Sequence, residues 1–334
     1  MYMRSLILIT LTFFSAIGCS NTDSDYSEPS FPKNDSAICR YLSDDPLEIT
    51  YPKDIIIAND NVLILSSSHG KWIHRYSTHD GSYLGSFAVN GRGPGEILSA
   101  ASIVMDRDGK TLSVFDSSTK RLVHYEVDGR FLSEIPADSS ASVVRRAWYL
   151  KKDSILYDGQ FDTEPGEQGR FALADNSGVM NVYNDFPVDD KVQRLAFIST
   201  PVTISPNGKM MATGTFMGAI LEIFALDRDL SKVTERDMYP PLVEFKNGSL
   251  WETPQMYFGF SDLTSTDKRI YSILIGSKNP EDLNAISVFN WNGKESIHYS
   301  IDIPVFKIAA QNDKELYGIS MADNEFYLVK IELP

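Results

Sequence analysis

The chain has few of the residues that build disulfide frameworks, zinc sites or nucleic-acid interfaces. Its 334 residues include only two cysteines, Cys19 and Cys39, and their spacing fits neither a disulfide scaffold nor a zinc-ligand pattern. Its 31 Lys and Arg residues are outnumbered by 45 Asp and Glu residues, which gives a formal net charge of -14 without any basic run. Because nucleic-acid phosphates are neutralised by clustered Lys and Arg, we expect no nucleic-acid partner, and we also expect no metal or cofactor.

The sequence also lacks helical periodicity and the common catalytic signatures. No segment keeps a 3.6-residue apolar period long enough to indicate the crossover helices of an α/β fold. We find no nucleophile elbow, no zinc-binding His-Glu helix, and no kinase or P-loop motif. The hydrophobic content of 43% nevertheless indicates a chain that folds around a sizeable core.

The N-terminus has the anatomy of a secretory signal. Arg4 precedes an apolar run, residues 5–14, and small residues lead to Cys19. The run is too short to span a membrane stably, and Ala16-Ile17-Gly18-Cys19 looks like a bacterial lipobox, in which the cysteine is acylated. We therefore expect a signal peptide over residues 1–18 and a membrane anchor on Cys19; the alternative is a secreted protein with an incidental cysteine. Residues 19–36 are polar, acidic and aperiodic, which predicts a flexible tether.

The rest of the chain repeats one unit at a period of about 50 residues. Each unit contains a polar turn followed by an apolar strand, and a second hairpin follows before the next unit. The six turns begin at Asn59, Asp106, Lys152, Ser205, Thr266 and Asn312. Polar turn residues and glycine suit tight hairpins, and the apolar runs suit strands buried on both faces. Four antiparallel strands per repeat at this period are typical of a β-propeller blade.

Six units predict an all-β, six-bladed β-propeller occupying residues 37–334 as a single domain. The last unit reaches the C-terminus after its third strand, near residues 325–331. The missing outer strand is expected from an N-terminal segment, either residues 37–42 or residues 47–50. Such a strand closes the ring and leaves no open sheet edge at the seam.

One loop carries a family resemblance. Residues 80–87 lead into Gly91-Arg92-Gly93-Pro94-Gly95-Glu96-Ile97, and this combination looks like the signature of the TolB-like six-bladed propeller lipoproteins of Bacteroidetes. The acidic stretch after Cys19 also resembles the export signal of that group's surface lipoproteins. The resemblance implies a fold and a cellular location. The location is that of an outer-membrane lipoprotein, which is surface-exposed or, alternatively, faces the periplasm. It implies no activity.

The same loop and two histidines are the candidate binding residues. The glycines suggest a phosphate-cradling loop, but the Lys-Ser/Thr ending and following helix of such loops are missing. The alternative is a connection between blades in which Arg92 and Glu96 pair with each other or with the backbone. His74 and His124 occupy similar places in the first two repeats, which fits either a binding or general-base role or simple packing.

Two function hypotheses remain open from the sequence. The first is a monomeric, lipid-anchored, non-enzymatic module that binds a protein or glycan partner at the cell envelope. The polar loops at residues 164–170 and 278–282 are candidate binding loops, or else merely solvated ones. The second is a hydrolase or lyase with its site at the mouth of the central channel. Convergent His, Asp, Glu or Asn in the channel would favour the enzyme, and an aromatic patch on one rim would favour the binding module.

Overall fold

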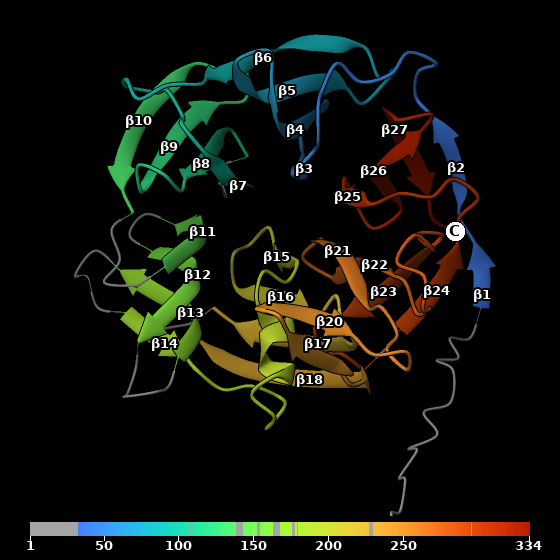
Figure 1. Ribbon diagram of the computed structural model, residues 1–334. Helices are drawn as coiled ribbons and strands as arrows, with labels where there is room; N and C mark the ends of the chain where they lie inside the picture. The colour runs from blue at the N-terminus through green and yellow to red at the C-terminus, as the bar shows by residue number, and fades with distance from the viewer. Residues whose placement is uncertain are drawn as a thin grey trace, which may run out of the picture.

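The computed structural model describes residues 33–106, 109–137, 143–151, 154–162, 168–175, 178, 180–226, 230–294 and 296–334. Within these residues, six antiparallel sheets stand around a central axis as the blades of a propeller (Figure 1). The predicted signal peptide and Cys19 lie outside the described residues. No helix in the described part of the chain has the length and hydrophobicity needed to cross a membrane.

The strands of each blade follow one another in sequence from the channel outward. Blade 1 contains β3 (Asp54–Ala58), β4 (Asn61–Ser68), β5 (Lys71–Ser77) and β6 (Tyr83–Val89). Blade 2 contains β7 (Ala100–Met105), β8 (Thr111–Asp116), β9 (Arg121–Glu126) and β10 (Phe131–Pro136). Blade 3 contains β11 (Val143–Lys151), β12 (Ser154–Asp162), β13 (Gln168–Asp175) and β14 (Met180–Tyr183).

The second half of the ring repeats this order. Blade 4 contains β15 (Val202–Ile204), β16 (Met210–Gly214), β17 (Ala219–Ala225) and β18 (Ser231–Tyr239). Blade 5 contains β21 (Phe260–Ser265), β22 (Arg269–Leu274), β23 (Ala285–Asn290) and β24 (Ser296–Ser300). Blade 6 takes only β25 (Lys307–Ala310), β26 (Glu315–Ala322) and β27 (Glu325–Glu332) from the C-terminal part of the chain.

An N-terminal strand completes blade 6, which confirms the predicted closure of the ring. Strand β2 (Ile38–Tyr41) pairs antiparallel with β27, with Ile38 opposite Glu332 and Tyr41 opposite Val329. Of the two segments that the sequence offered, the first therefore supplies the strand. The second segment follows β2 along β27, where the backbone N–H of Leu47 donates to Phe326 O at 2.7 Å.

A further strand precedes β2 and corrects the predicted extent of the tether. Strand β1 (Lys33–Ser36) runs parallel to β24 and makes blade 5 five-stranded. Its hydrogen-bonding groups continue into Ala37, whose N–H donates to Ser300 O at 3.0 Å. Regular structure therefore begins within residues 19–36, which were predicted to be a flexible tether. The backbone of β1 finds hydrogen-bonding partners on β24, the outer strand of blade 5.

The hydrophobic core lies between neighbouring blades. Leu63 and Ile73 of blade 1, for example, pack with Ile103 and Val114 of blade 2, and all four are almost completely buried. The middle strands contact a neighbouring blade on each face, which explains their continuous apolar runs. Strand β4 shows five consecutive buried residues from Val62 to Ser66.

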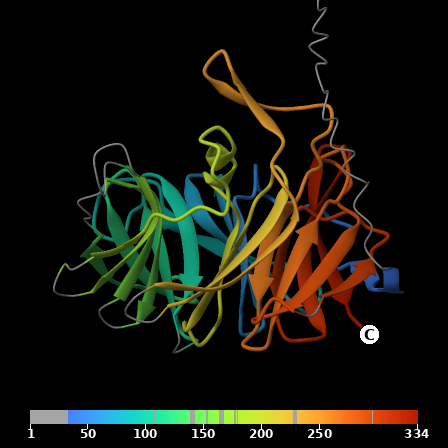
Figure 2. The ribbon, with the colours of Figure 1, turned by 90° about the horizontal axis from the view of Figure 1, so that it is seen from below.

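Two insertions depart from the simple repeat. The short 3-10 helix η1 (Gln193–Phe197) lies between blades 3 and 4, and the hairpin of β19 (Val243–Lys246) and β20 (Ser249–Glu252) lies between blades 4 and 5. Both occur in connections from an outer strand to the next inner strand, and such connections share one face of a propeller. Figure 2 shows them rising on the same side, which we call the insertion face.

Candidate functional site

The insertion face over blade 4 is covered by an apolar layer that holds both insertions. Phe197 of η1 packs with Ile220, and Met217 lies against this cluster. Met217 also packs against a second cluster formed by Met256, Phe258 and Ile275, which lies beneath the hairpin. The two insertions are therefore joined through a common hydrophobic base.

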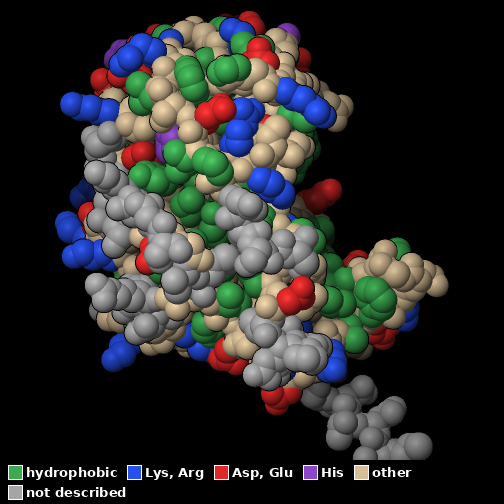
Figure 3. Space-filling model, turned by 90° about the vertical axis from the view of Figure 1, so that its left-hand side faces the viewer, with side chains coloured by type: hydrophobic (Ala, Val, Ile, Leu, Met, Phe, Trp, Pro, Cys, Tyr) green, Lys and Arg blue, Asp and Glu red, His purple; other side chains and the backbone are tan. Residues whose placement is uncertain are grey.

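The hairpin itself carries exposed aromatic side chains. Phe245 is 54% exposed and Trp251 is 52% exposed, although both side chains are large and apolar. The register places Glu244 opposite Trp251 and Phe245 opposite Leu250, so the two aromatic side chains lie on opposite faces of the hairpin. In profile the hairpin projects from the body of the molecule, with hydrophobic side chains gathered around its base (Figure 3).

A pocket of about 520 Å³ adjoins η1 on the same face. Strands β12 and β13 form one wall, and the segment from Asn184 to Ile198 forms the other. Behind the pocket, Arg170 makes a two-pronged ion pair with Glu222 of blade 4, with Nη1–Oε2 and Nη2–Oε1 distances of 2.7 and 2.8 Å. Both side chains are at least 95% buried, so this pair fixes blade 3 against blade 4.

The central channel is charged at its mouth and apolar below. A cavity of about 170 Å³ opens at the insertion face, and each of the six blades contributes to its lining. Lys307 Nζ lies 3.2 Å from Asp262 Oδ1, and Arg146 is held by Asp158 and by Thr200 O. Further down, a cavity of about 350 Å³ is lined chiefly by aliphatic side chains of the inner strands and by Trp148.

One carboxyl group at this mouth has a perturbed pKa. Burial raises the pKa of Asp54 to about 6; the Asp262 carboxylate adds to the shift, whereas Lys307 and Arg146 oppose it. A carboxyl group that titrates near neutrality in a cavity is a recognised mark of acid–base sites, although structural ion-pair networks produce it too. The described residues contain no group of three or more His, Cys, Asp or Glu side chains able to hold a metal ion.

The glycine-rich loop lies between blades 1 and 2, and its own residues hold the turn. Glu96 Oε2 accepts the Gly93 N–H at 2.7 Å, and the Gly91 N–H donates to Ile97 O at 3.1 Å. Gly95 has φ +69°, and a Cβ there would approach the ring of Phe131 to 2.8 Å, so only glycine fits without rearrangement. The expectation was that Arg92 and Glu96 pair with each other or with the backbone, and Glu96 does bond the backbone. Arg92 is exposed and forms no ion pair with Glu96 or any other described residue, so the pairing between the two side chains is not seen.

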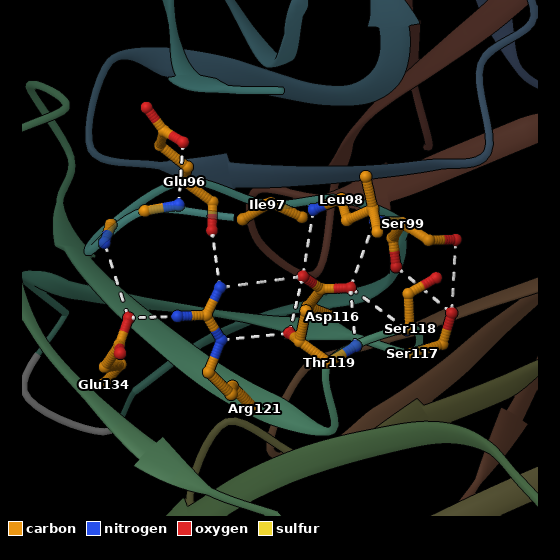
Figure 4. A network of polar contacts seen from close by, with 12 residues as sticks. Glu96, Ile97, Leu98, Ser99, Asp116, Ser117, Ser118, Thr119, Arg121 and Glu134 are labelled. Carbon is orange, nitrogen blue, oxygen red and sulfur yellow. Dashed lines mark hydrogen bonds and ion pairs between the residues drawn. The ribbon is translucent and has the colours of Figure 1, made fainter. Parts of the chain in front are cut away.

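Residues of blade 2 fasten this loop in place of Arg92. Arg121 donates from Nη2 to Glu96 O at 3.0 Å and from Nη1 to Glu134 Oε2 at 2.8 Å (Figure 4). The fully buried Asp116 accepts the N–H groups of Leu98 and Ser99 at 2.9 and 3.1 Å. We call Asp116, Arg121 and Glu134 the loop clasp.

Removing the Asp116 carboxylate should destabilise the fold, whereas removing Arg92 should not. Burial raises the pKa of Asp116, but its hydrogen bonds outweigh this and lower the pKa overall. Because the pKa of Asp116 is lower in the folded protein than in the unfolded chain, where it is near 3.8, the ionised carboxylate stabilises the fold above pH 3.8. This stabilisation is lost as the pH falls through the pKa of the folded protein. We expect Asp116→Asn to cost about 2–3 kcal/mol of unfolding free energy at pH 7 and to weaken its acid dependence.

Denaturant titration from pH 7 to pH 3 measures both effects. Arg92→Ala is the control and should change the unfolding free energy by less than about 0.5 kcal/mol. Equal losses for the two variants would show that Arg92 holds the loop as strongly as Asp116 does, which would contradict the role given to the loop clasp.

The two candidate histidines are buried within their blades. His74 is 0% and His124 is 5% exposed, and burial lowers the pKa of each. His124 Nδ1 lies 2.8 Å from Ser113 Oγ on the neighbouring strand, and His298 makes the same kind of contact with Ser287 at 2.6 Å. These positions favour the packing role and argue against the prediction that His74 and His124 contribute to a binding surface.

The structure describes the two predicted binding loops to different extents. Residues 163–167 lie outside the described part, while Arg170, predicted in a polar loop, is buried in β13. The 278–282 loop packs near the base of the hairpin, with Lys278 Nζ 5.3 Å from the Tyr257 ring centre. Sequence reasoning missed the hairpin itself, although Asn247-Gly248 between apolar residues is a strong hairpin signal.

Comparison with protein families decides the classification. The family model described as TolB-like 6-blade propeller-like matches residues 30–313, which is most of the chain. The chain belongs to the TolB-like six-blade propeller family. This confirms the resemblance seen in the glycine-rich loop, together with the six-bladed fold. No curated protein matches the chain.

Solved structures similar to this TolB-like propeller include two Bacteroides proteins and a lyase. A Bacteroides vulgatus member of the DUF4221 family is 10% identical, with a TM-score of 0.55 over 90% of this chain and 98% of that one. A protein from Bacteroides fragilis described as exported is 12% identical (TM-score 0.52; 90% and 95% covered). Virginiamycin B lyase from Staphylococcus aureus is 10% identical (TM-score 0.52; 90% and 100% covered). Identities this low show the shared fold alone.

Proposed function

We propose that this TolB-like propeller is a lipid-anchored, non-enzymatic binding module of the cell envelope. Its partner, a protein or a glycan, docks on the insertion face over blades 4 and 5. The observation that carries the proposal is the β19–β20 hairpin, which stands off the rim with Phe245 and Trp251 exposed. The lipobox-like sequence ending at Cys19 supports the anchor and an outer-membrane location.

The exposed aromatic residues favour a protein partner over a glycan. An isolated two-stranded hairpin is marginally stable in water, so this one depends on its base. The apolar cluster beneath the hairpin is well ordered by its contacts, because Tyr239 Oη donates to Phe258 O at 2.8 Å and Met256 is 98% buried. A rigid base presenting Trp and Phe matches the aromatic anchors that dominate protein interfaces.

Loss of the hairpin aromatics should abolish capture of the partner. We expect Phe245→Ser/Trp251→Ser to weaken binding at least about tenfold, since buried aromatic anchors each contribute about 2 kcal/mol or more. The measurement is pull-down from envelope extracts and glycan-array screening with protein lacking residues 1–19, followed by titration of the partner found.

The control removes two exposed apolar side chains elsewhere. Val233 on β18 and Met321 on β26 are 49% and 60% exposed, and Val233→Ser/Met321→Ser should bind as the unaltered protein does. Equal binding by the hairpin variant and the control would refute the docking surface. Both variants should keep the melting temperature, because none of the four side chains is buried.

A second candidate function rests on the channel mouth. A hydrolase or lyase there would use Asp54, whose pKa of about 6 suits proton transfer near neutral pH, beside Asp262 and Lys307. Turnover that is lost in Asp54→Asn, while the hairpin variant remains active, would favour this alternative.

A further inference from the structure

The pocket beside η1 has a lining unlike that of an apolar ligand site. Six of its fifteen lining residues are charged and three more carry side-chain amides, so polar groups predominate. Its volume of about 520 Å³ lies within the range usual for small-molecule sites. A ligand that fits would therefore offer several hydrogen-bonding groups, together with some apolar surface for Phe186, Leu195, Phe197 and Ile198.

Two of the four cations in the pocket remain available to a ligand. Arg170 is neutralised by Glu222, and Arg145 Nη2 lies 2.7 Å from Asp158 Oδ1. Among the described residues, Lys191 and Arg194 form no ion pair. Within the part of the chain that the structure describes, Arg194 donates only from Nε, to Val188 O at 3.1 Å, and its terminal nitrogens have no partner there.

The position of Arg194 is fixed before any ligand arrives. Its guanidinium lies 5.2 Å from the ring centre of Phe186, and the guanidinium of Arg170 lies 4.8 Å from the same ring. Phe186 in turn packs edge-on against the buried Phe197 of η1. A stacked arginine loses little freedom on binding an anion, which favours affinity.

Two carboxylates in the lining restrict the charge of the ligand. Asp162 and Asp185 line the same pocket. Asp185 is partly neutralised by Lys232, whose Nζ lies 3.4 Å from its Oδ2, whereas Asp162 forms no ion pair among the described residues, so a doubly charged phosphate would meet repulsion as well as attraction. A single carboxylate can bind at Lys191 and Arg194, while hydroxyl groups can donate to Asp162 and Asp185. Side-chain amides, which both donate and accept, suit hydroxyl groups as well.

We propose that this pocket binds a sugar acid, that is, a polyhydroxylated ring carrying one carboxylate. Lys191 and Arg194 hold the carboxylate, and the acidic and amide side chains hold the hydroxyl groups. The inference rests on the proposed binding role but concerns a pocket that Phe245 and Trp251 do not line, so the two can fail separately.

Calorimetric titration with four sugar probes tests the ligand class on protein lacking residues 1–19. Glucuronate should bind at least about tenfold more tightly than glucose, because a charge-assisted contact replaces a neutral one. It should also bind more tightly than glucose 6-phosphate. A galacturonate disaccharide tests whether the acid is recognised free or within a chain, and binding of either form supports the proposal.

A charge-matched pair of variants tests the residues. Lys191→Gln/Arg194→Gln should raise the Kd for the acid at least about tenfold. Lys268→Gln/Lys314→Gln removes the same charge from turns on the opposite face and should leave the Kd unchanged. Four results would overturn the proposal. Glucose or glucose 6-phosphate could bind more tightly than glucuronate, neither sugar acid could bind, or both double variants could lose the same affinity for the acid. The hairpin variant should bind the sugar acid normally, which separates this result from the docking surface.

Discussion

A chain that begins at Ser43, and so lacks β1 and β2, should melt at least about 10 °C below the intact protein. Strand β2 supplies the outer strand of blade 6, and its removal exposes the edge of β27 along the positions from Val329 to Glu332. The same deletion removes the buried Ala37, which packs in the cluster between blades 5 and 6.

The size of this effect follows from the lost contacts. Each backbone hydrogen bond is worth about 1 kcal/mol net, and the four paired positions and the buried side chain together account for several kcal/mol. Each kcal/mol shifts the melting temperature of a domain this large by about 2–4 °C. The bared edge also provides a template for pairing between molecules, so we expect aggregation on heating.

Scanning calorimetry of the shortened chain measures the loss. Ile38→Ser/Arg40→Ser serves as the control, because both side chains are exposed and the β2 backbone remains paired. The control should melt within about 2 °C of the unaltered protein, since exposed substitutions have small effects. A shortened chain that melts like the control would show that β2 does not close the ring.

Glu222→Ala should cost about 3–5 kcal/mol of unfolding free energy, because it leaves the Arg170 guanidinium buried without its counter-charge. Arg170 is also surrounded by aromatic rings of Phe171, Tyr183, Phe186 and Phe197. These rings contribute cation–π attraction but cannot replace a carboxylate. Denaturant midpoints at constant m-value report the difference.

A neighbouring ion pair gives the matched control. Glu235 lies on β18, and its Oε2 is 2.7 Å from Lys232 Nζ, at partly exposed positions. Glu235→Ala should cost less than about 1 kcal/mol, as such pairs usually do. The double variant Arg170→Met/Glu222→Leu should recover part of the loss, since no unpaired charge remains. Similar costs for Glu222→Ala and Glu235→Ala would contradict the structural role of the buried pair.

The repeat and its closure could be predicted because they depend on local signals. Turn residues and apolar runs recur with each blade, and the shortage of strands at the C-terminus required a strand from elsewhere. The β19–β20 hairpin was missed, because an insertion between two blades lengthens one repeat without interrupting the sequence of turns and apolar strands.

Contacts between distant segments could not be read from spacing. From the sequence, Arg92 and Glu96 were expected to pair with each other or with the backbone. Glu96 accepts a backbone N–H, but the register of β9 brings Arg121 to the loop, and Arg92 is exposed. His74 and His124 were expected at equivalent positions, but the registers place them on opposite faces of their blades. His74 lies opposite Ile64 on the side that faces blade 6, whereas the His124 ring lies 5.2 Å from Tyr149 of blade 3. The pocket beside η1 likewise needs the fold, since residues of β12 and β13 meet a later segment only in the folded ring.

The most direct test of the binding role compares two surfaces with one partner. The partner captured from envelope extracts or the glycan array is titrated against Phe245→Ser/Trp251→Ser and against Asp54→Asn at the channel mouth. The proposed function predicts at least about tenfold weaker binding by the hairpin variant and unchanged binding by Asp54→Asn. Unchanged binding by the hairpin variant, with loss in Asp54→Asn, would contradict it and place the function in the channel.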